Sequence, residues 1–400
     1  MDAMSTAART AVIVDAVRTP SGRGKPGGAL SGIHPVDLAA HVLRATIERN
    51  GLESTQIDDV LLGCVSQVGE QTLNIARQAV LAAGFDESVP GATIDRQCGS
   101  SQQAAHFAAQ GVMAGQYDIV IAGGVESMSR VPLGVASAVA GSPFSPGLRA
   151  RYPEGLVNQG VSAELVAQRW GLSRDALDAY AAQSHRRAGA AGEDDRFAGQ
   201  IVPVQTDAGE LDSDETVRPG TTAAGLAGLA PAFHTEELAA RFPEIDWRIT
   251  AGNSSPLTDG ASAVLIMSEE RARALGLTPR ARFHAFAVAG DDPLMMLTGI
   301  IPATRRILER SGLGIDDLDA YEVNEAFASV PLAWAAEFGA DAAKLNPWGG
   351  AIALGHALGS SGTRLLGTLL AHLEATGGRF GLQTMCEGGG MANATIIERL

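Results

Sequence analysis

The sequence predicts an α/β fold made of two similar halves, with a long inserted segment between parts of the fold. Short β-branched runs alternate with alanine-rich stretches of helical spacing, a pattern typical of layered α/β proteins. Short motifs of the first half recur, in the same order, in the second. A chain of 400 residues with 46% apolar residues is too long for one ordinary core, but it can fill two or three packed units.

The first half is expected to alternate strands and helices. Each predicted strand is a short run of β-branched or other apolar residues. Of the two predicted helices, the second is nearly apolar all round, which is typical of a buried helix. The predicted strands are 11–14, 60–63, 119–122 and 258–267, and the predicted helices are 35–49 and 100–114.

Two tripeptides carry the internal repeat. Ile57-Asp58-Asp59 recurs as Ile315-Asp316-Asp317, and Gly99-Ser100-Ser101 recurs as Gly359-Ser360-Ser361, at almost the same separation along the chain. Each Gly-Ser-Ser opens an alanine- or leucine-rich helix that leads to a strand and then a glycine cluster. Two matches in one structural order favour a duplicated unit.

The segment 129–257 differs from both halves because it carries more Pro, Gly, Asp and Arg. One clear helix is expected at 171–187, with Ser173 as its N-cap and Asp175 in its first turn. A long insertion between repeated cores often forms part of a binding site. We therefore expect this segment to contribute to ligand binding.

Composition limits the classes of partner. The formal net charge of −15 argues against nucleic acid or an anionic membrane as the main partner. Three widely spaced cysteines cannot all pair, which favours a reducing compartment, and the spacings of zinc sites are absent. The polar start 1–9 lacks the apolar core of a secretory signal, and no apolar run approaches membrane-helix length. We expect a cytoplasmic protein without a metal site.

Two cysteines and one histidine lie in runs of glycine and small residues. Cys98 stands before Gly99, His356 follows Gly355, and Cys386 precedes a triple glycine. Glycine allows a substrate to approach the backbone, and N–H groups at a helix start favour a thiolate and can hold an oxyanion. Together these residues indicate covalent acyl transfer. Cys64 lies in an apolar strand and is expected to pack in the core.

Taken together, these stretches resemble the thiolase family over nearly the whole chain, starting with 11–20. The resemblance implies an α/β fold of two similar cores in five layers, α-β-α-β-α, with an inserted loop domain. On this basis the N-terminal core is 1–128 plus 258–279, the loop domain is 129–257 and the C-terminal core is 280–400. The motifs that carry the resemblance are Cys98–Ser100, Gly123–Ser129, Asn324–Ala328, Gly355–His356 and Cys386–Gly390.

The resemblance implies a role for each site residue in thiolysis of a 3-oxoacyl-CoA by CoA. Cys98 would be the nucleophile, His356 its base, and Cys386 the general acid/base. Asn324 would hold a water that, with His356, stabilises the enolate oxygen. The N–H groups of Cys98 and Gly388 would form a second oxyanion hole. Glu325 is expected only to orient its loop.

Coenzyme A is expected as a substrate, with no tightly bound cofactor. By family position Arg218 would lie against the adenine, Phe233 would wall the pantetheine arm and Ser255 would touch that arm. The resemblance also implies a homodimer or homotetramer, and a hydratase–dehydrogenase chain is a candidate partner.

The chain departs from the family pattern at three places. Ala357, where the family often has proline, follows the motif histidine. Asn158-Gln159 stands where short-chain acetoacetyl-CoA thiolases carry a His-Met pair, and the stretch 236–247 is longer than usual. These departures favour a bulky or branched acyl group, even a steroid-derived one, over acetoacetyl-CoA.

Three alternatives stay open at this point. A biosynthetic acetyl-CoA C-acetyltransferase would use the same residues on a smaller substrate. A ketoacyl synthase shares the fold, but Cys386 and the Asn324 loop argue against it. A silent lipid-CoA binding protein would have lost a catalytic residue, and all four are present.

Overall fold

The computed structural model describes residues 9–139 and 141–400. Most of the polar segment 1–9, from which we expect no secretory signal, therefore lies outside the described residues. Ten strands join into one continuous sheet, and a separate two-stranded hairpin lies in the middle of the chain. Among the described helices, none combines the length and the apolar character needed to cross a bilayer.

The first half forms one end of the sheet, with strand order β1-β8-β5-β3-β4. The predicted helix 35–49 matches α1, and α3 begins at Ser100 as expected. Strand β5 runs further than its apolar run, and β8 matches the predicted 258–267 to within one residue. The elements are β1 (Ala11–Arg18), β2 (Gly22–Arg23), α1 (Pro35–Arg49), β3 (Asp59–Gly63), α2 (Ile75–Ala82), β4 (Gly91–Ile94), α3 (Ser100–Met113), β5 (Ile119–Ser127), β8 (Thr258–Ser268) and α10 (Glu269–Ala274).

The second half repeats this arrangement, with strand order β9-β12-β11-β10. In the first half β4 pairs in parallel with β3, and in the second half a parallel bridge between Leu345 and Tyr321 of β10 takes the equivalent place. The repeated tripeptides lie at equivalent places, so the expected duplication is confirmed. The elements are β9 (Ala281–Gly290), α11 (Ile300–Ser311), β10 (Ala320–Val323), α12 (Ser329–Phe338), α13 (Ala351–Leu354), α14 (Ser361–Thr376), β11 (Phe380–Glu387) and β12 (Met391–Arg399).

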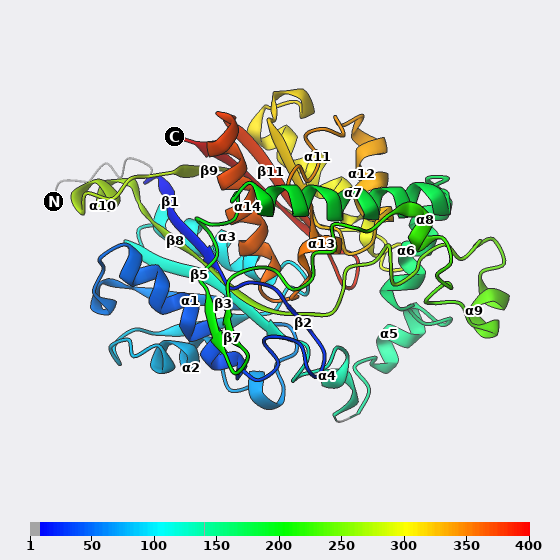
Figure 1. The fold of residues 1–400 in the computed structure, drawn as a ribbon, viewed down its shortest axis with the longest axis horizontal. Coiled ribbons are helices and arrows are strands. Elements are labelled where there is room, and N and C mark those ends of the chain that lie inside the picture. The colour runs from blue at the N-terminus through cyan, green and yellow to red at the C-terminus, as the bar shows by residue number, and fades with distance from the viewer. Residues whose placement is uncertain (1–8, 140) are drawn as a thin grey trace.

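The layers follow from where the apolar side chains gather. Helices α1 and α2 cover the outer face of the first half-sheet, and α11 and α12 cover that of the second. Helices α3 and α14 share a core with both half-sheets. Within residues 9–139 and 141–400, the half-sheets are joined where β1 pairs with β9, through Val12–Arg282 and Ile13–Ala281. This gives the expected order α-β-α-β-α, which Figure 1 shows from α1 and α2 through α14 to α11.

Helices α3 and α14 approach each other closely in the central layer. A Cβ on Gly362 would lie 2.2 Å from the backbone N of Gln102, so only glycine fits there. Gln102 also donates to Thr395 of β12 (2.7 Å), and Thr363 N–H donates to Ser101 (3.1 Å). The two Gly-Ser-Ser helix starts therefore lie side by side, each near the other half's strands.

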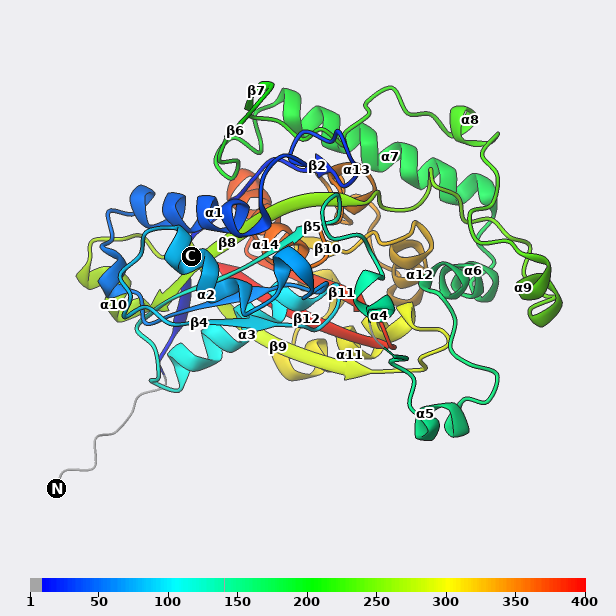
Figure 2. The same ribbon diagram turned by 90° about the horizontal axis from the view of Figure 1, so that it is seen from below.

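The segment 129–257 passes over the two halves as short elements around one long helix. Helix α7 has Ser173 as N-cap, accepting from Ala176 N–H, and Asp175 in its first turn, as expected. Figures 1 and 2 both show α5 and α9 extending away from the sheet. The elements are α4 (Val135–Ala138), α5 (Pro146–Arg151), α6 (Gln159–Arg169), α7 (Arg174–Glu193), β6 (Val204–Thr206), β7 (Gly209–Leu211), α8 (Ala223–Leu226) and α9 (Glu236–Arg241).

Candidate active site

Cys98 lies in a tight turn directly before α3. Gln97 has a positive φ of 49°, a conformation that non-glycine residues adopt mainly where surrounding contacts enforce it. Here Ser100 supplies those contacts: its hydroxyl accepts from Arg96 N–H (2.9 Å) and donates to the Gln97 carbonyl (2.6 Å). The turn holds the Cys98 thiol only 7% exposed, with Gly99 as the N-cap of α3.

Burial raises the pKa of the Cys98 thiol well above the ordinary value, against the effect of the helix start, which favours a thiolate. Cys386 and Glu387, when ionised, raise it further. A helix N-terminus contributes about 1 kcal/mol or less at an ordinary site, which is too little to offset burial. A base must therefore remove the Cys98 proton during attack.

His356 is fixed at both its backbone and its ring. Its N–H donates to Thr258 of β8 (2.9 Å), next to Gly355 at φ 82°. Its Nδ1 lies 2.6 Å from the Ser361 hydroxyl, which donates its own proton to the Ala357 carbonyl (2.8 Å). Ser361 must then accept from Nδ1–H, so Nε2 is left as the basic nitrogen.

The ring of His356 is neutral over the working pH range. Burial lowers its pKa to about 3, and the charge of Arg364 acts in the same direction. A neutral imidazole whose Nε2 carries no proton can accept one from a thiol.

Asn324 joins His356 to Cys386. It follows β10, and its Nδ2 lies 3.4 Å from His356 Nε2. A hydrogen bond from Asn324 also acts on Cys386, where it opposes the rise in pKa that burial causes. Cys386 in turn lies close enough to Cys98 for its charge to raise the Cys98 pKa. The structure thus brings Cys98, Asn324, His356 and Cys386 together.

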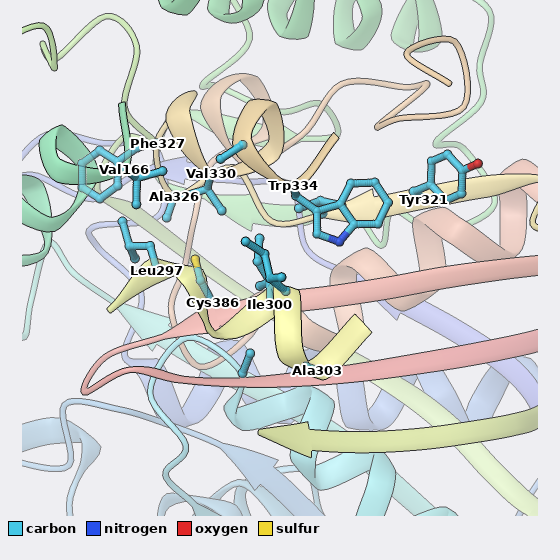
Figure 3. Close-up of a cluster of buried hydrophobic side chains, with 14 of the residues drawn as sticks. Val166, Leu297, Ile300, Ala303, Tyr321, Ala326, Phe327, Val330, Trp334 and Cys386 are labelled. Atoms are coloured by element: carbon cyan, nitrogen blue, oxygen red, sulfur yellow. The ribbon is translucent and has the colours of Figure 1, made fainter. Parts of the chain in front are cut away.

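Cys386 is almost fully buried near the end of β11, and Figure 3 shows its sulfur beside Leu297 and Ile300, below Ala326. Burial raises its pKa to about 12. The resting thiol therefore keeps its proton and can supply it to a developing carbanion.

Gly388 lies in the turn between β11 and β12. A Cβ at this position would lie 2.9 Å from Gln97 Oε1, so the turn rests on the segment that carries Cys98. The next two residues, Gly389 and Gly390, have φ of 83° and 80°, which glycine adopts without strain. The triple glycine therefore lets the β11–β12 turn approach the nucleophile.

Glu325 links the Asn324 loop to α7. Its carboxylate accepts from the hydroxyls of Tyr180 (2.9 Å) and Ser184 (2.7 Å) on α7. It also accepts from Asn346 Nδ2 (2.9 Å) and from Ile352 N–H (3.0 Å), at the start of α13. These bonds tie the residue that follows Asn324 to α7 and to the segment that precedes His356.

The three residues predicted to contact CoA lie in different surroundings. Ser255 N–H donates to the Ala326 carbonyl (3.0 Å), and the Phe233 ring packs edge-on against Phe327 with centroids 5.9 Å apart. Both therefore contact the loop that carries Asn324. Arg218 is exposed, and its N–H donates to His185 of α7 (3.2 Å). The structure gathers two of the three beside the site.

Comparison with known proteins identifies the family. The model of the thiolase N-terminal domain matches residues 11–270, and that of the thiolase C-terminal domain matches residues 277–399. The chain belongs to the thiolase family. Thiolases are acyltransferases, so the expected enzyme class is confirmed.

This thiolase has similar relatives and a similar solved structure. It is 48% identical to a steroid 3-ketoacyl-CoA thiolase of Mycobacterium tuberculosis, over 98% of this chain and 94% of that protein. It is 45% identical to a 3-ketoacyl-CoA thiolase of Vibrio cholerae, over 98% and 99%. The crystal structure of the Bacillus anthracis acetyl-CoA acetyltransferase matches with a TM-score of 0.88 and 38% identity, covering 99% of this chain and all of that one.

Sequence reasoning missed the residues that hold the site of this thiolase in place. Ser361 and Thr258 orient His356, and neither lies in a motif that indicates catalysis. The repeated Gly-Ser-Ser was the available signal for Ser361, but it was interpreted only as evidence of duplication. Cys64 is fully buried in the outer core of the first half, as expected. Among the described residues, no cluster of side chains suits a metal ion.

Proposed function

We propose that this thiolase cleaves 3-oxoacyl-CoA with CoA, giving acetyl-CoA and a shortened acyl-CoA by a ping-pong mechanism. One observation carries the proposal: Asn324 contacts both His356 and Cys386, and Cys386 lies near Cys98. The site thus combines a nucleophile (Cys98), a base (His356) and an acid (Cys386). Two of its relatives are named as 3-ketoacyl-CoA thiolases, one of them for steroids, which supports the degradative direction in β-oxidation of fatty or steroid-derived acids.

In the first step the Cys98 sulfur attacks the C3 carbonyl carbon, and the thiol proton moves to His356 Nε2. The carbonyl oxygen becomes an oxyanion, held by the N–H groups of Cys98 and Gly388. Each such donor stabilises the transition state by about 3 kcal/mol.

In the second step the C2–C3 bond breaks, and the electron pair leaves with the acetyl-CoA portion as an enolate. Cys386 gives its proton to C2 and becomes a thiolate. Asn324, through a bound water, and the His356 imidazolium stabilise the enolate oxygen. Acetyl-CoA leaves, and the shortened acyl group remains as a thioester on Cys98.

In the third step free CoA enters and passes its thiol proton to the Cys386 thiolate. The CoA sulfur attacks the acyl-Cys98 carbonyl, and the Cys98–carbon bond breaks. The departing Cys98 sulfur takes back the proton from His356. The enzyme thus returns to two thiols and a neutral imidazole.

We also propose that segment 129–257 is a loop domain that binds CoA and makes oligomer contacts, with Arg218 at the adenine and Phe233 and Ser255 along the pantetheine arm. Contacts of Phe233 and Ser255 with the loop after β10 support their place, because a pantetheine tail must reach that loop. A homodimer or homotetramer in the cytoplasm, with a hydratase–dehydrogenase chain as partner, completes this proposal.

For the acyl group we propose a bulky or branched chain. Asn158 caps α6 by accepting from Gly160 N–H (2.8 Å), at the place of the His-Met pair. Phe242 and Ile245, from the lengthened stretch 236–247, pack on Val161 of α6 and against Phe233. The stretch thus adds apolar bulk beside the proposed pantetheine wall. Steady-state rates over an acyl-CoA panel test this, and a clear best rate with acetoacetyl-CoA would contradict it.

Variants of the two cysteines test the mechanism. Thiolysis is followed by loss of the magnesium–enolate absorbance of a 3-oxoacyl-CoA. Cys98→Ala should abolish turnover, because no thioester can form. Cys386→Ser should lower turnover by about 10²–10⁴-fold while sparing acyl transfer to Cys98 more than the full cycle. Full activity of Cys98→Ala would refute the mechanism, and the core cysteine variant Cys64→Ala is the matched control.

A further inference from the structure

The duplication places two glutamates at equivalent positions. Glu126 near the end of β5 pairs across the sheet with Gly260 of β8, and Glu387 at the end of β11 pairs with Met391 of β12. Each carboxyl lies against the Gly-Ser-Ser of the opposite half. Glu126 accepts from Gly359 N–H (2.9 Å), and Glu387 Oε1 lies 2.0 Å from where a Cβ on Gly99 would be.

The two glutamates differ in their hydrogen bonds. Glu126 also accepts from Val65 N–H (2.9 Å), Ser66 N–H (3.0 Å) and Gln71 Nε2 (2.7 Å), so its bonds hold the first half together. Glu387 is equally buried, yet neither of its carboxyl oxygens has a partner among the described residues. A buried carboxyl without partners is costly when ionised, so its structural role is small compared with that of Glu126.

The position of Glu387 relates it to both thiols. It directly follows Cys386, and it lies against Gly99, which directly follows Cys98. The Gly99 carbonyl is already bonded to Asn393 Nδ2 (2.9 Å). The other charged groups that act on the carboxyl are Asp95 and Arg96, both in the turn before α3.

We propose that Glu387 is a positioning residue that controls the ionisation of the Cys98 thiol: in its neutral form it permits the thiolate, and in its ionised form it opposes it. This inference rests on the proposed function, in which Cys98 must lose its proton during attack. It adds an acid to the site that the family motifs do not assign.

The electrostatics agree with this geometry. Burial raises the pKa of Glu387 to about 8, against the opposing charge of Arg96. The charge of Glu387 raises the pKa of Cys98 and of Cys386. The carboxyl is therefore mainly protonated near neutrality and ionises above about pH 8, where it suppresses thiolate formation at Cys98.

The test is the rate of alkylation of Cys98 by iodoacetamide from pH 6.5 to 9.5, with the modified peptide identified by mass spectrometry. The comparison is between the unchanged protein and Glu387→Gln, which keeps the shape but cannot ionise. The ratio of variant to wild-type rate should be near one at pH 6.5 and should rise to about tenfold at pH 9.5. A ratio that stays constant across the range, or falls, would overturn the proposal, because a purely structural role gives no pH dependence.

Two further variants keep the test valid even if Glu387→Gln fails to fold. Glu387→Leu places an apolar side chain of similar size at a site without hydrogen bonds, and it should reproduce the rising ratio. Glu322→Gln is the matched control, because burial also raises the pKa of Glu322 to about 8, whereas the charged groups that act most on the pKa of Cys98 are Cys386, Glu387 and Glu126. Its ratio should be flat. Alkylation needs no turnover, so this outcome is separate from the Cys98→Ala test of the reaction.

Discussion

At the scale of single residues, the chemistry depends on the protonation states of the two thiols and the imidazole. The sequence motifs identify Cys98, Asn324, His356 and Cys386, because glycine neighbours and family order mark them. They do not reveal that burial keeps both thiols protonated and the imidazole neutral, since desolvation depends on atoms from distant segments. The hydrogen bond of Ser361 to His356 was equally hidden, because only the start of α14 brings that hydroxyl to the ring.

Ser361→Ala should lower kcat by about tenfold with little change in KM. The substitution removes the acceptor of the His356 Nδ1 proton, so the ring loses its fixed tautomer, and a buried donor is left unsatisfied at a cost of about 1–3 kcal/mol. Steady-state kinetics check this. The neighbouring Ser360→Ala removes a bond to Ser262 instead and is the control. Equal losses in both variants would contradict the role given to Ser361.

The acylation rate should show no titration of His356 between pH 5 and 7. The folded-state pKa of His356 is lowered to about 3 from its ordinary 6.5, so the ring stays neutral and able to accept a proton until the pH falls towards 3. Single-turnover rates of Cys98 acylation over this range provide the measurement. A one-proton fall in rate centred near pH 6.5 would show that the ring is solvated and ordinary.

At the scale of elements, the sequence pattern located whole elements better than their ends, since α7 runs to Glu193, past its predicted end at 187. Helix α1 was predicted residue for residue, because an apolar face, a proline start and a polar end all mark it. Strand β5 extends beyond its apolar run, into glycine, glutamate and serine. Polar residues at the strand end are buried where other segments satisfy their hydrogen bonds, as Val65 N–H does for Glu126. Hydropathy alone cannot detect such buried polar residues.

Gly362→Ala should destabilise the fold by at least about 1–3 kcal/mol. The new Cβ would meet the backbone of Gln102 at 2.2 Å, and neither α3 nor α14 can shift without disturbing both half-sheets. Urea unfolding measures the effect. Gly192→Ala in α7 faces open space, so it should be neutral or stabilising by about 0.5–1 kcal/mol. A neutral Gly362→Ala would show that the helices are loosely packed.

Tyr180→Phe should weaken the tie between α7 and the Asn324 loop. The substitution leaves Glu325 and Asn346 each without one buried partner, so we expect about 1–3 kcal/mol of lost stability and a several-fold lower kcat. Melting temperature and turnover are both measured. Tyr152→Phe, outside this network, is the control. A loss of stability with unchanged kcat would mean that α7 supports the fold and not the site.

At the scale of the whole molecule, duplication explains both the architecture and the asymmetry of the site. The sequence predicted the repeat from two tripeptides and the five layers from family resemblance. It could not predict that the half-sheets are continuous through the short β1–β9 pairing, because strand order between repeats leaves no local pattern. The two halves share one plan, yet Glu126 accepts several hydrogen bonds, while the Glu387 carboxyl finds no partner in the described part of the chain.

The expected oligomer should depend on the apolar surface of segment 129–257. Leu133, Val139 and Phe144 are 47%, 65% and 47% exposed, and such side chains gathered in one segment are typical of an interface. Light scattering should give a mass of two or four 41.2 kDa chains. The double variant Leu133→Asp with Phe144→Asp should shift this mass downward. A monomeric wild type would contradict the expectation, and an unchanged mass of the variant would place the interface elsewhere.

The central claim is that Cys98 carries the acyl group between the two substrates. A 3-oxoacyl-CoA mixed with the enzyme in the absence of free CoA should release acetyl-CoA and leave an acyl group, shorter by one acetyl unit, on the peptide that contains Cys98. Peptide mass spectrometry after rapid acid quenching provides the measurement. An acyl group on Cys386, or release of acetyl-CoA with no modified peptide, would contradict the account.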